Sequence, residues 1–180
     1  MSGLKVLSQP VVIDLGYNEI MRNFSELKGS FVEVGLWGDG DDPATNLAAR
    51  GAVHEYGTQN GRIPSRPWMR QTAEKYAEEV NDFVVKLLES LTDRNISGIT
   101  FLGLLGAFYE GKMKAIFTEG EFAELAASTI ARKGSDTPLI DTGLMRASIT
   151  SKVFIKNHEL FQSFIDAMED NKISEEAELE

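Results

Sequence analysis

Alternating apolar and polar residues predict two β-strands. In residues 31–37, FVEVGLW, every second side chain from Val32 to Leu36 is apolar, so one face of a strand would look inward. Residues 148–155, SITSKVFI, alternate in the same way, with Ile149 and Val153 on one side. We expect these two strands to pair. The apolar run at residues 10–15, PVVIDL, is a further candidate for an edge strand because proline stands at its start.

Helical spacing of apolar residues predicts the remaining elements. Residues 17–27 place Ile20, Phe24 and Leu27 on one face. Residues 66–91 are expected to form the longest helix, capped by Ser65 and lying on the sheet, with packing between subunits along its apolar stripe as the alternative. Its apolar stripe would be Met69, Ala73, Tyr76, Val80, Phe83, Leu87 and Leu91.

Three other segments also have helical patterns. Residues 43–56 follow Asp42 as a capping residue, carry Pro43 at the first position and stop at Gly57. Residues 98–117 follow Ser97 as a cap and contain Gly103 and Gly106, whose cost in a helix suggests close approach of another helix. Residues 158–168 are amphipathic, whereas the chain from residue 172 onward is too acidic to order itself.

These elements predict an α+β fold with a small antiparallel sheet packed with several helices, one long helix at about 66–91, and a C-terminal extension. A chain of 180 residues has the length of one domain with appendages. We expect an N-terminal strand and helix arm over 1–30, a core over 31–156, and an acidic extension over 157–180.

The negative charge is concentrated at the C-terminus. The formal net charge is −10, and residues 157–180 contribute −7 of it through eight acids and one base. The other 156 residues hold 17 bases and 20 acids, and no basic patch stands out in the sequence. The extension is read either as a solvated terminus, or as a segment that docks on a partner ring or repels DNA.

The sequence offers few candidates for chemistry. His54-Glu55 is not the metal motif H-E-x-x-H, because Thr58 stands where the second histidine would be. The acid-rich loop at 38–42, GDGDD, lacks the spacing of a calcium loop. With no cysteine and no apolar run of about 18 residues, we expect no metal, cofactor or membrane span. A hydrolase using His54 with Glu55 or Asp141 is a weaker alternative.

Residues 128–151, STIARKGSDTPLIDTGLMRASITS, are expected to form a rigid connection between a helix and a strand. A short helix would end at Lys133-Gly134, and turn residues follow at 135–138. Asp141 or Thr142 would cap a new helical turn, with Gly143 allowing a tight entry. We expect the buried side to hold Leu144, Ala147 and Ile149, with Arg146 reaching outward.

This stretch and residues 54–70, HEYGTQNGRIPSRPWMR, resemble two motifs of the head–tail joining and tail-completion proteins of long-tailed bacteriophages, also called the neck or virion morphogenesis family. The motifs occur in the family order and the resemblance covers roughly residues 31–153. Trp68 stands where phenylalanine is more usual. The matching positions are Pro64, Arg66, Pro67, Trp68, Arg70, Leu139, Asp141, Thr142, Gly143, Leu144, Arg146, Ser148 and Ile149.

The resemblance implies a structural protein without a reaction, forming a ring in the virion neck after assembly in the host cytoplasm. Its implied partners are copies of itself, a hexamer by analogy with the sixfold tail, the head-side connector or adaptor proteins, and the tail terminator, tube or sheath proteins. DNA would pass nearby without specific binding. A tail terminator or head-closure (stopper) role in the same neck stays open, and a DNA-binding accessory role is disfavoured by the acid excess.

Within this resemblance, the three arginines of the motifs have the side chains best suited to charge-assisted bonds. Arg66, Arg70 and Arg146 could make such bonds within the subunit or across to a neighbouring one.

Overall fold

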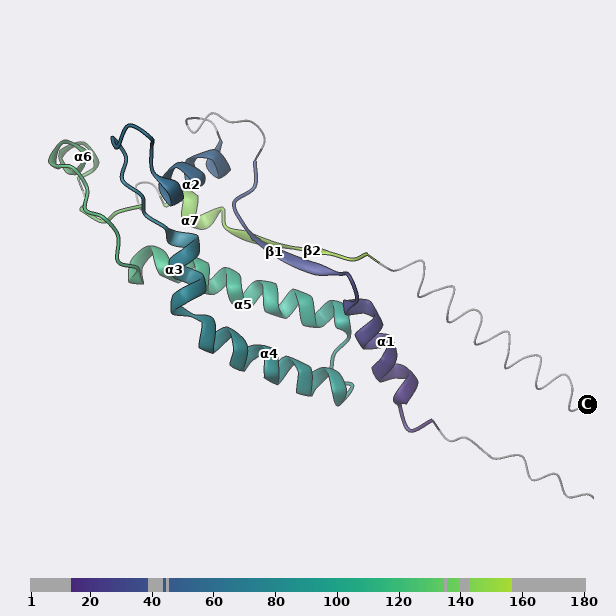
Figure 1. Cartoon of the computed structure of the whole chain (residues 1–180). Helices are drawn as coiled ribbons and strands as arrows, with labels where there is room; N and C mark the ends of the chain where they lie inside the picture. The colour runs from purple at the N-terminus through teal and green to yellow at the C-terminus, as the bar shows by residue number, and fades with distance from the viewer. Residues whose placement is uncertain (1–13, 39–43, 45, 135, 140–142, 157–180) are drawn as a thin grey trace, which may run out of the picture.

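The sheet joins two segments that lie far apart in the sequence. A computed structural model describes residues 14–38, 44, 46–134, 136–139 and 143–156 (Figure 1). Strands β1 (Phe31–Gly35) and β2 (Thr150–Phe154) pair antiparallel, with Phe31 opposite Phe154 at one end and Gly35 opposite Thr150 at the other. The predicted pairing is therefore confirmed, and Val32, Val34 and Val153 lie on the half-buried face.

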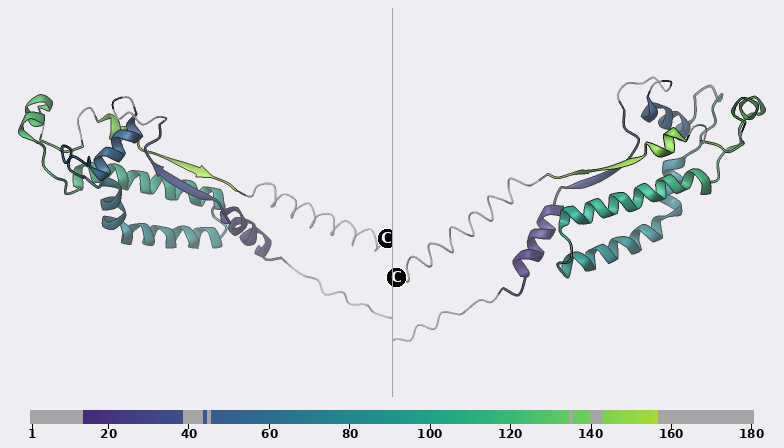
Figure 2. Two further views of the ribbon diagram at one scale, coloured as in Figure 1. Left: turned by 45° about the horizontal axis from the view of Figure 1, so that its top comes forward. Right: turned by 180° about the vertical axis from the view of Figure 1, so that it is seen from behind.

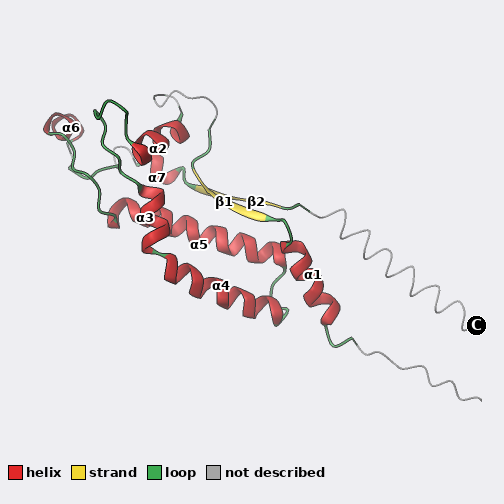
Figure 3. Cartoon of the chain, viewed as in Figure 1, coloured by secondary structure: helices red, strands yellow, loops and turns green. Residues whose placement is uncertain are grey.

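Helix α5 (Gly98–Glu119) is the central element of the fold. It contacts both strands on one side, while α3 (Trp68–Lys75) and α4 (Ala77–Thr92) contact it on the other, so α5 lies between the sheet and α4 (Figures 1 and 2). It begins as predicted at Ser97, whose hydroxyl accepts the N–H of Thr100 at 3.2 Å. The α+β class is confirmed, and helices and strands are distinguished in Figure 3.

The prediction of a single helix over 66–91 that is the longest in the chain, is capped by Ser65 and lies on the sheet is wrong. The segment is divided at Tyr76, where φ is −107° and ψ is 12°, into α3 and α4. Its 16-residue second part is shorter than α5, which has 22 residues, and it packs on α5 rather than lying on the sheet. Ser65 does not cap α3 either, since Pro67 holds the N-cap position.

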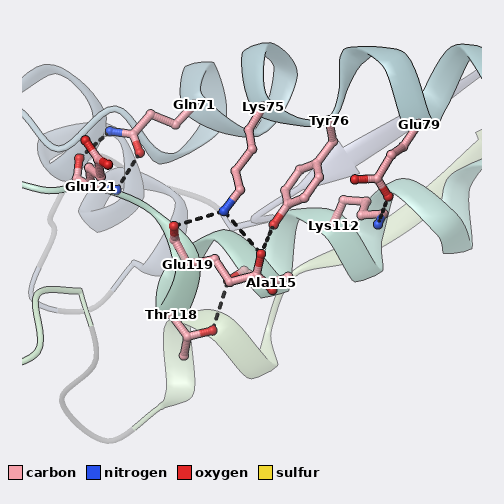
Figure 4. A network of polar contacts seen from close by, with 9 residues as sticks. All are labelled: Gln71, Lys75, Tyr76, Glu79, Lys112, Ala115, Thr118, Glu119 and Glu121. Carbon is pink, nitrogen blue, oxygen red and sulfur yellow. Dashed lines mark hydrogen bonds and ion pairs between the residues drawn. The ribbon is translucent and has the colours of Figure 1, made fainter.

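A polar network explains how α3 and α4 are held beside the end of α5 (Figure 4). The Tyr76 hydroxyl donates to Glu119 Oε2 at 2.8 Å, and Lys75 Nζ lies 3.2 Å from the same oxygen. Gln71 exchanges two hydrogen bonds with the backbone of Glu121, at 2.6 and 3.1 Å. These bonds join residues more than 40 positions apart in the sequence. They are tertiary contacts, and they favour the break between α3 and α4 at Tyr76.

We expect the Tyr76–Glu119 hydrogen bond to make the free energy of unfolding depend on pH. The hydrogen bond from Tyr76, followed by that from Lys75, holds the pKa of Glu119 below its ordinary 4.5. A lowered pKa in the folded state stabilises the fold above the unfolded pKa, and this contribution is lost as the pH falls. Urea titrations from about pH 5 to about pH 3 should therefore show a smaller loss of stability for Tyr76→Phe than for the wild type. Equal losses in the two proteins would contradict this assignment.

Four shorter helices complete the described chain. Helix α1 (Tyr17–Leu27) contacts α5 and α4, and the Asp14 carboxylate accepts the N–H groups of Gly16 and Tyr17 at its start. Helices α2 (Leu47–Tyr56), α6 (Ala127–Lys133) and α7 (Leu144–Ala147) lie at the opposite end of the molecule (Figure 1). Among the described residues, no helix is both long and apolar enough to cross a bilayer.

Two of these helices differ from expectation. Helix α2 is capped by Asn46, whose side chain accepts the N–H groups of Ala48 and Ala49, so it starts later than predicted. In α1 the buried residue is Asn23, which donates to the Ile96 carbonyl at 3.3 Å, while Phe24 is 39% exposed. The predicted cap Asp42, Pro43, most of the edge strand at 10–15 and the helix at 158–168 lie outside the described residues.

The core consists of two clusters along α5. The first gathers both family-like motifs around the C-terminal half of α5, with Trp68, Tyr76, Met113, Ile116, Phe117, Met145 and Ile149. The second lies between α4 and the N-terminal half of α5, with Leu87, Leu91, Phe101 and Leu102. The stripe predicted for residues 66–91 thus supplies core residues to both clusters.

The glycines of α5 allow close approach at two positions. A Cβ on Gly98 would lie 2.3 Å from the Asn23 carbonyl oxygen, so α1 meets α5 there as a helix–helix contact. At Gly106 the neighbour is the sheet, with Val32 Cγ2 at 2.7 Å, so the expected helix partner is wrong at this position. Gly103 has no atom within 4 Å of its Cβ position, and the expectation of close approach is wrong there too.

Alanine substitutions should therefore have opposite effects at two positions of the same helix. Gly103→Ala should raise the free energy of unfolding by about 1 kcal/mol, because it removes backbone entropy of the unfolded chain without a clash. Gly106→Ala should lower it, since Val32 and Ser151 would have to move. Urea denaturation of both variants measures the difference. Stabilisation by Gly106→Ala would contradict the close packing of α5 on the sheet.

Candidate functional site

The first family-like motif begins with a buried carboxylate that caps a helix. Glu55, near the end of α2, is buried, and its two oxygens accept the N–H groups of Met69 at 2.8 Å and Arg70 at 3.2 Å. These N–H groups belong to the first turn of α3, where they have no partner within the helix. A negative charge at a helix N-terminus also interacts favourably with the positive end of the helix dipole. Glu55 therefore fixes α3 against α2.

Arg66 ties this junction to a third segment. Its guanidinium donates from Nε to the Ala123 carbonyl and from an Nη to the Glu124 carbonyl, both at 2.8 Å. Its own N–H donates to the His54 carbonyl at 2.7 Å, and the Ser65 hydroxyl donates to the Glu55 carbonyl at 2.6 Å. The side chain is buried, so Arg66 acts inside the subunit. We call the assembly of residues 54–70 and 121–126 the motif node.

Trp68 joins the motif node to the core. It is 2% exposed, and its Nε1 donates to the Gly51 carbonyl at 3.1 Å. Its ring packs on Phe117 with the centroids 5.4 Å apart. A phenylalanine could make the ring contact but not the hydrogen bond. The tryptophan at this position thus connects α2 to α5 through α3.

The loop between α2 and α3 is closed by its own hydrogen bonds. The N–H of Thr58 donates to the Ile63 carbonyl, and the N–H of Ile63 donates to the Thr58 hydroxyl, both at 3.0 Å. Asn60 accepts from the Thr58 hydroxyl and from the N–H of Arg62. Gly57 enters the loop with φ 75° and ψ −173°, a conformation open essentially to glycine alone.

The second family-like motif packs on α5 beside the first. Gly134 ends α6 with φ 71° as predicted, and Gly143 precedes α7 with φ 75°. Met145 and Ile149 are buried in the same cluster as Trp68. The expected burial of Leu144 and Ala147 is wrong, because both are exposed. The buried residue of α7 is Met145, one position after Leu144.

The remaining motif residues have different surroundings. Arg146 donates from Nε to the Lys114 carbonyl of α5 at 3.0 Å, within the subunit. Pro64 and Arg70 are exposed and Pro67 is half-buried, and the Arg70 side chain bonds to no described residue. Asp141 and Thr142, the predicted capping residues, lie outside the described residues. The structure thus brings the described residues of both motifs together, and the side chains of Arg66, Trp68 and Arg146 donate to backbone carbonyls of other segments of the same subunit.

Two adjoining cavities open beside the motif node, and no sequence pattern predicted them. They have volumes of about 440 and 450 Å³ and share His54, Leu125, Thr129 and Arg132 in their walls. Further basic residues line them from separate segments: Arg50 and Lys133 in the first cavity, Arg62 and Arg66 in the second. These basic residues are spread over more than 80 positions of the sequence. No local run of positive charge therefore predicts that they cluster.

The electrostatics of the cavities are positive. Burial lowers the pKa of His54, and the charges of Arg66, Arg50 and Lys133 lower it further. Its buried Nδ1 has no hydrogen-bond partner in the described part of the chain. Glu124 contributes a carboxylate to the wall of the second cavity. No basic patch stands out in the sequence, but the fold gathers basic residues around these two cavities.

The geometry gives His54 and Glu55 separate surroundings. Glu55 uses both oxygens to cap α3, whereas His54 lines the cavities and its backbone carbonyl accepts the N–H of Arg66. In the described ranges, no three side chains of the histidine, cysteine, aspartate or glutamate type gather in a way that could hold a metal ion. The arrangement is suited to holding segments together and to attracting anions.

Comparison with known proteins returned no match to a family model, a curated protein or a solved structure.

Proposed function

We propose that this chain is a structural protein of the neck of a long-tailed bacteriophage, where identical copies form a ring that completes the tail and joins it to the head connector. The proposal starts from the resemblance of residues 54–70 and 128–151 to the motifs of the neck proteins. It is supported by the use of these residues as caps, anchors and core contacts around one node.

The observation that carries the proposal is the incomplete sheet. Among the described residues, each strand has a single hydrogen-bonded neighbour, so each has an unpaired outer edge. Unpaired edges bind strands of other chains unless they are covered, and a sheet of two strands is weak alone. Pairing with neighbouring copies around a ring would complete the sheet.

The outer face of the sheet also fits an interface. Phe31 and Phe154 stack with their centroids 4.9 Å apart while 48% and 39% exposed, and Lys152 lies 3.9 Å over the Trp37 ring. Aromatic residues are enriched at interfaces between proteins. On α1, Tyr17, Met21 and Phe24 follow helical spacing and are exposed as well. Within the part of the chain that the structure describes, these two apolar surfaces are solvent-exposed, and flanking copies or rings could pack on them.

Removal of the gene from a phage that encodes the chain tests the proposal. We expect filled heads and separate tails to accumulate, and joined infectious particles to return when the chain is supplied from a plasmid. Normal yields of joined particles without the chain would contradict the proposal.

A pair of variants makes the same test specific to the interface. Phe31→Ser should fail to restore joined particles although the purified variant folds. Val85→Ser, which changes an equally exposed apolar residue on α4, should restore them. Equal rescue by both variants would remove the sheet face from the interface.

A further inference from the structure

The basic cavities beside the motif node combine cations with an apolar floor. Leu139, Leu144 and Met145 line the first cavity, and Leu125 lines both. Leu144 is 53% exposed, so part of this apolar lining is accessible to solvent. A ligand that matches these walls must carry both carboxylates and apolar side chains. Nucleic acid offers phosphates but no aliphatic side chains, and a cavity of this size does not admit a duplex.

Several of the cations have donors to spare. Arg62 and Arg132 are exposed, and neither side chain bonds to a described residue. Lys133 donates to the Thr137 carbonyl and Arg66 to two carbonyls, so the described partners of both groups are uncharged. None of these four forms an ion pair within the described ranges. Among the described residues that line the two cavities, the cations therefore outnumber the single carboxylate, that of Glu124.

The chain itself contains a segment with the required chemistry. Residues 157–180 carry a net charge of −7, and their first half places apolar residues between the acids: Leu160, Phe161, Phe164, Ile165 and Met168. Such a segment could offer carboxylates to the arginines and apolar groups to the floor together. Opposite charges would also speed its encounter with the cavity.

The start of this segment lies far from the cavities of its own subunit. The N–H of Lys156 donates to the Ser30 hydroxyl at 3.3 Å, beside the turn between α1 and β1. The cavities lie at the other end of the sheet, around α2, α6 and α7 (Figures 1 and 2). A contact in which one end of a copy meets the other end of the next is heterologous, and such contacts form a ring when the rotation between copies closes and an open filament when it does not.

We propose that the acidic segment 157–180 of one copy binds in the basic cavities of the adjacent copy and links the subunits head to tail. This inference deepens the proposed function, on which it rests for the side-by-side arrangement of copies. The segment supplies carboxylates to Arg132, Lys133 and Arg62, and apolar side chains to the leucines of the floor.

Disulfide trapping between full-length chains tests the inference, because the chain has no native cysteine. One variant carries Thr129→Cys in the cavity wall and the other carries Ser163→Cys in the segment. On oxidation of the mixture we expect about tenfold more linked dimer than with Lys86→Cys, on the exposed face of α4, as the partner. Adding Arg132→Glu to the cavity variant should reduce the yield about tenfold, whereas adding Lys86→Glu should not.

Three results would overturn the inference. Equal yields with Thr129→Cys and Lys86→Cys would show no preference for the cavity. An internal disulfide in the doubly substituted chain, formed in excess wild type, would place the segment in its own subunit. A gel shift of duplex DNA that Arg132→Glu abolishes would assign the cavity to phosphate.

Native mass spectrometry of the same samples separates this inference from the proposed function. Rings that form without the cross-link would leave the proposed function standing and remove only the role of the segment. A chain that never associates with itself, alone or with neck partners, would contradict the proposed function instead.

Discussion

Trp68→Ala should lower the free energy of unfolding by about 3–5 kcal/mol, the range for removing a large aromatic side chain from a core. The indole is 2% exposed, packs on Phe117 and donates to the Gly51 carbonyl. Its loss leaves a cavity between α2, α3 and α5 and removes a hydrogen bond to the α2 backbone. Urea denaturation followed by circular dichroism measures the change.

Trp68→Phe is the matched control for this prediction. It keeps an aromatic ring against Phe117 and removes the hydrogen bond to Gly51, so we expect a loss of about 1–3 kcal/mol. A Trp68→Ala protein within about 1 kcal/mol of the wild type would show that this part of the motif is not a core anchor. A Trp68→Phe protein as unstable as Trp68→Ala would place the effect in the hydrogen bond alone.

Gly57→Ala should have the second largest effect, because two costs act at one residue. The backbone conformation, with φ 75° and ψ −173°, costs a residue with a Cβ about 1–3 kcal/mol. The new Cβ would also lie 2.9 Å from the Ile63 carbonyl oxygen and from the Ser65 nitrogen, both backbone atoms that cannot rotate away. The loop would have to move, taking with it the bonds that Ser65 and Arg66 make to α2.

Gly61→Ala separates the two costs. Gly61 has φ 68° but no atom within 4 Å of its Cβ position, so only the backbone strain of about 1–2 kcal/mol applies. We expect Gly57→Ala to be clearly less stable than Gly61→Ala in the same urea titration. Equal stabilities would show that the loop yields easily and does not hold the motif node together.

Local sequence signals predicted the parts of the fold that local physics decides. Alternation located both strands, Ser97 marked the start of α5, and Gly134 marked the end of α6. Each signal acts through neighbours within a few residues. The stripe over residues 66–91 likewise identified core residues, because the apolar period continues across the break.

Contacts between distant residues decided the features that the sequence did not reveal. Tyr76 is neither glycine nor proline, so its residue type does not signal a break in a helix. Its hydroxyl binds Glu119, which is 43 positions further along the chain. The cap of α3 comes from Glu55 in another helix, which made nearby Ser65 the wrong choice. Helix α7 has only four residues, too few for periodicity to separate Met145 from Leu144.

The candidate site was predicted in part. The two motifs were found as sequence stretches, and the structure places their described residues around α5. The basic cavities required the fold, since Arg50, Arg62 and Arg132 come from three segments that no pattern connects.

The proposed function requires this chain to be one member of a closed ring at the junction of head and tail. Electron cryomicroscopy of the neck of intact particles tests this most directly. It should show copies of this fold around the tail axis, with the sheets of neighbouring copies in contact. Particles that lack the chain, or that contain it as isolated copies away from the neck, would contradict the account.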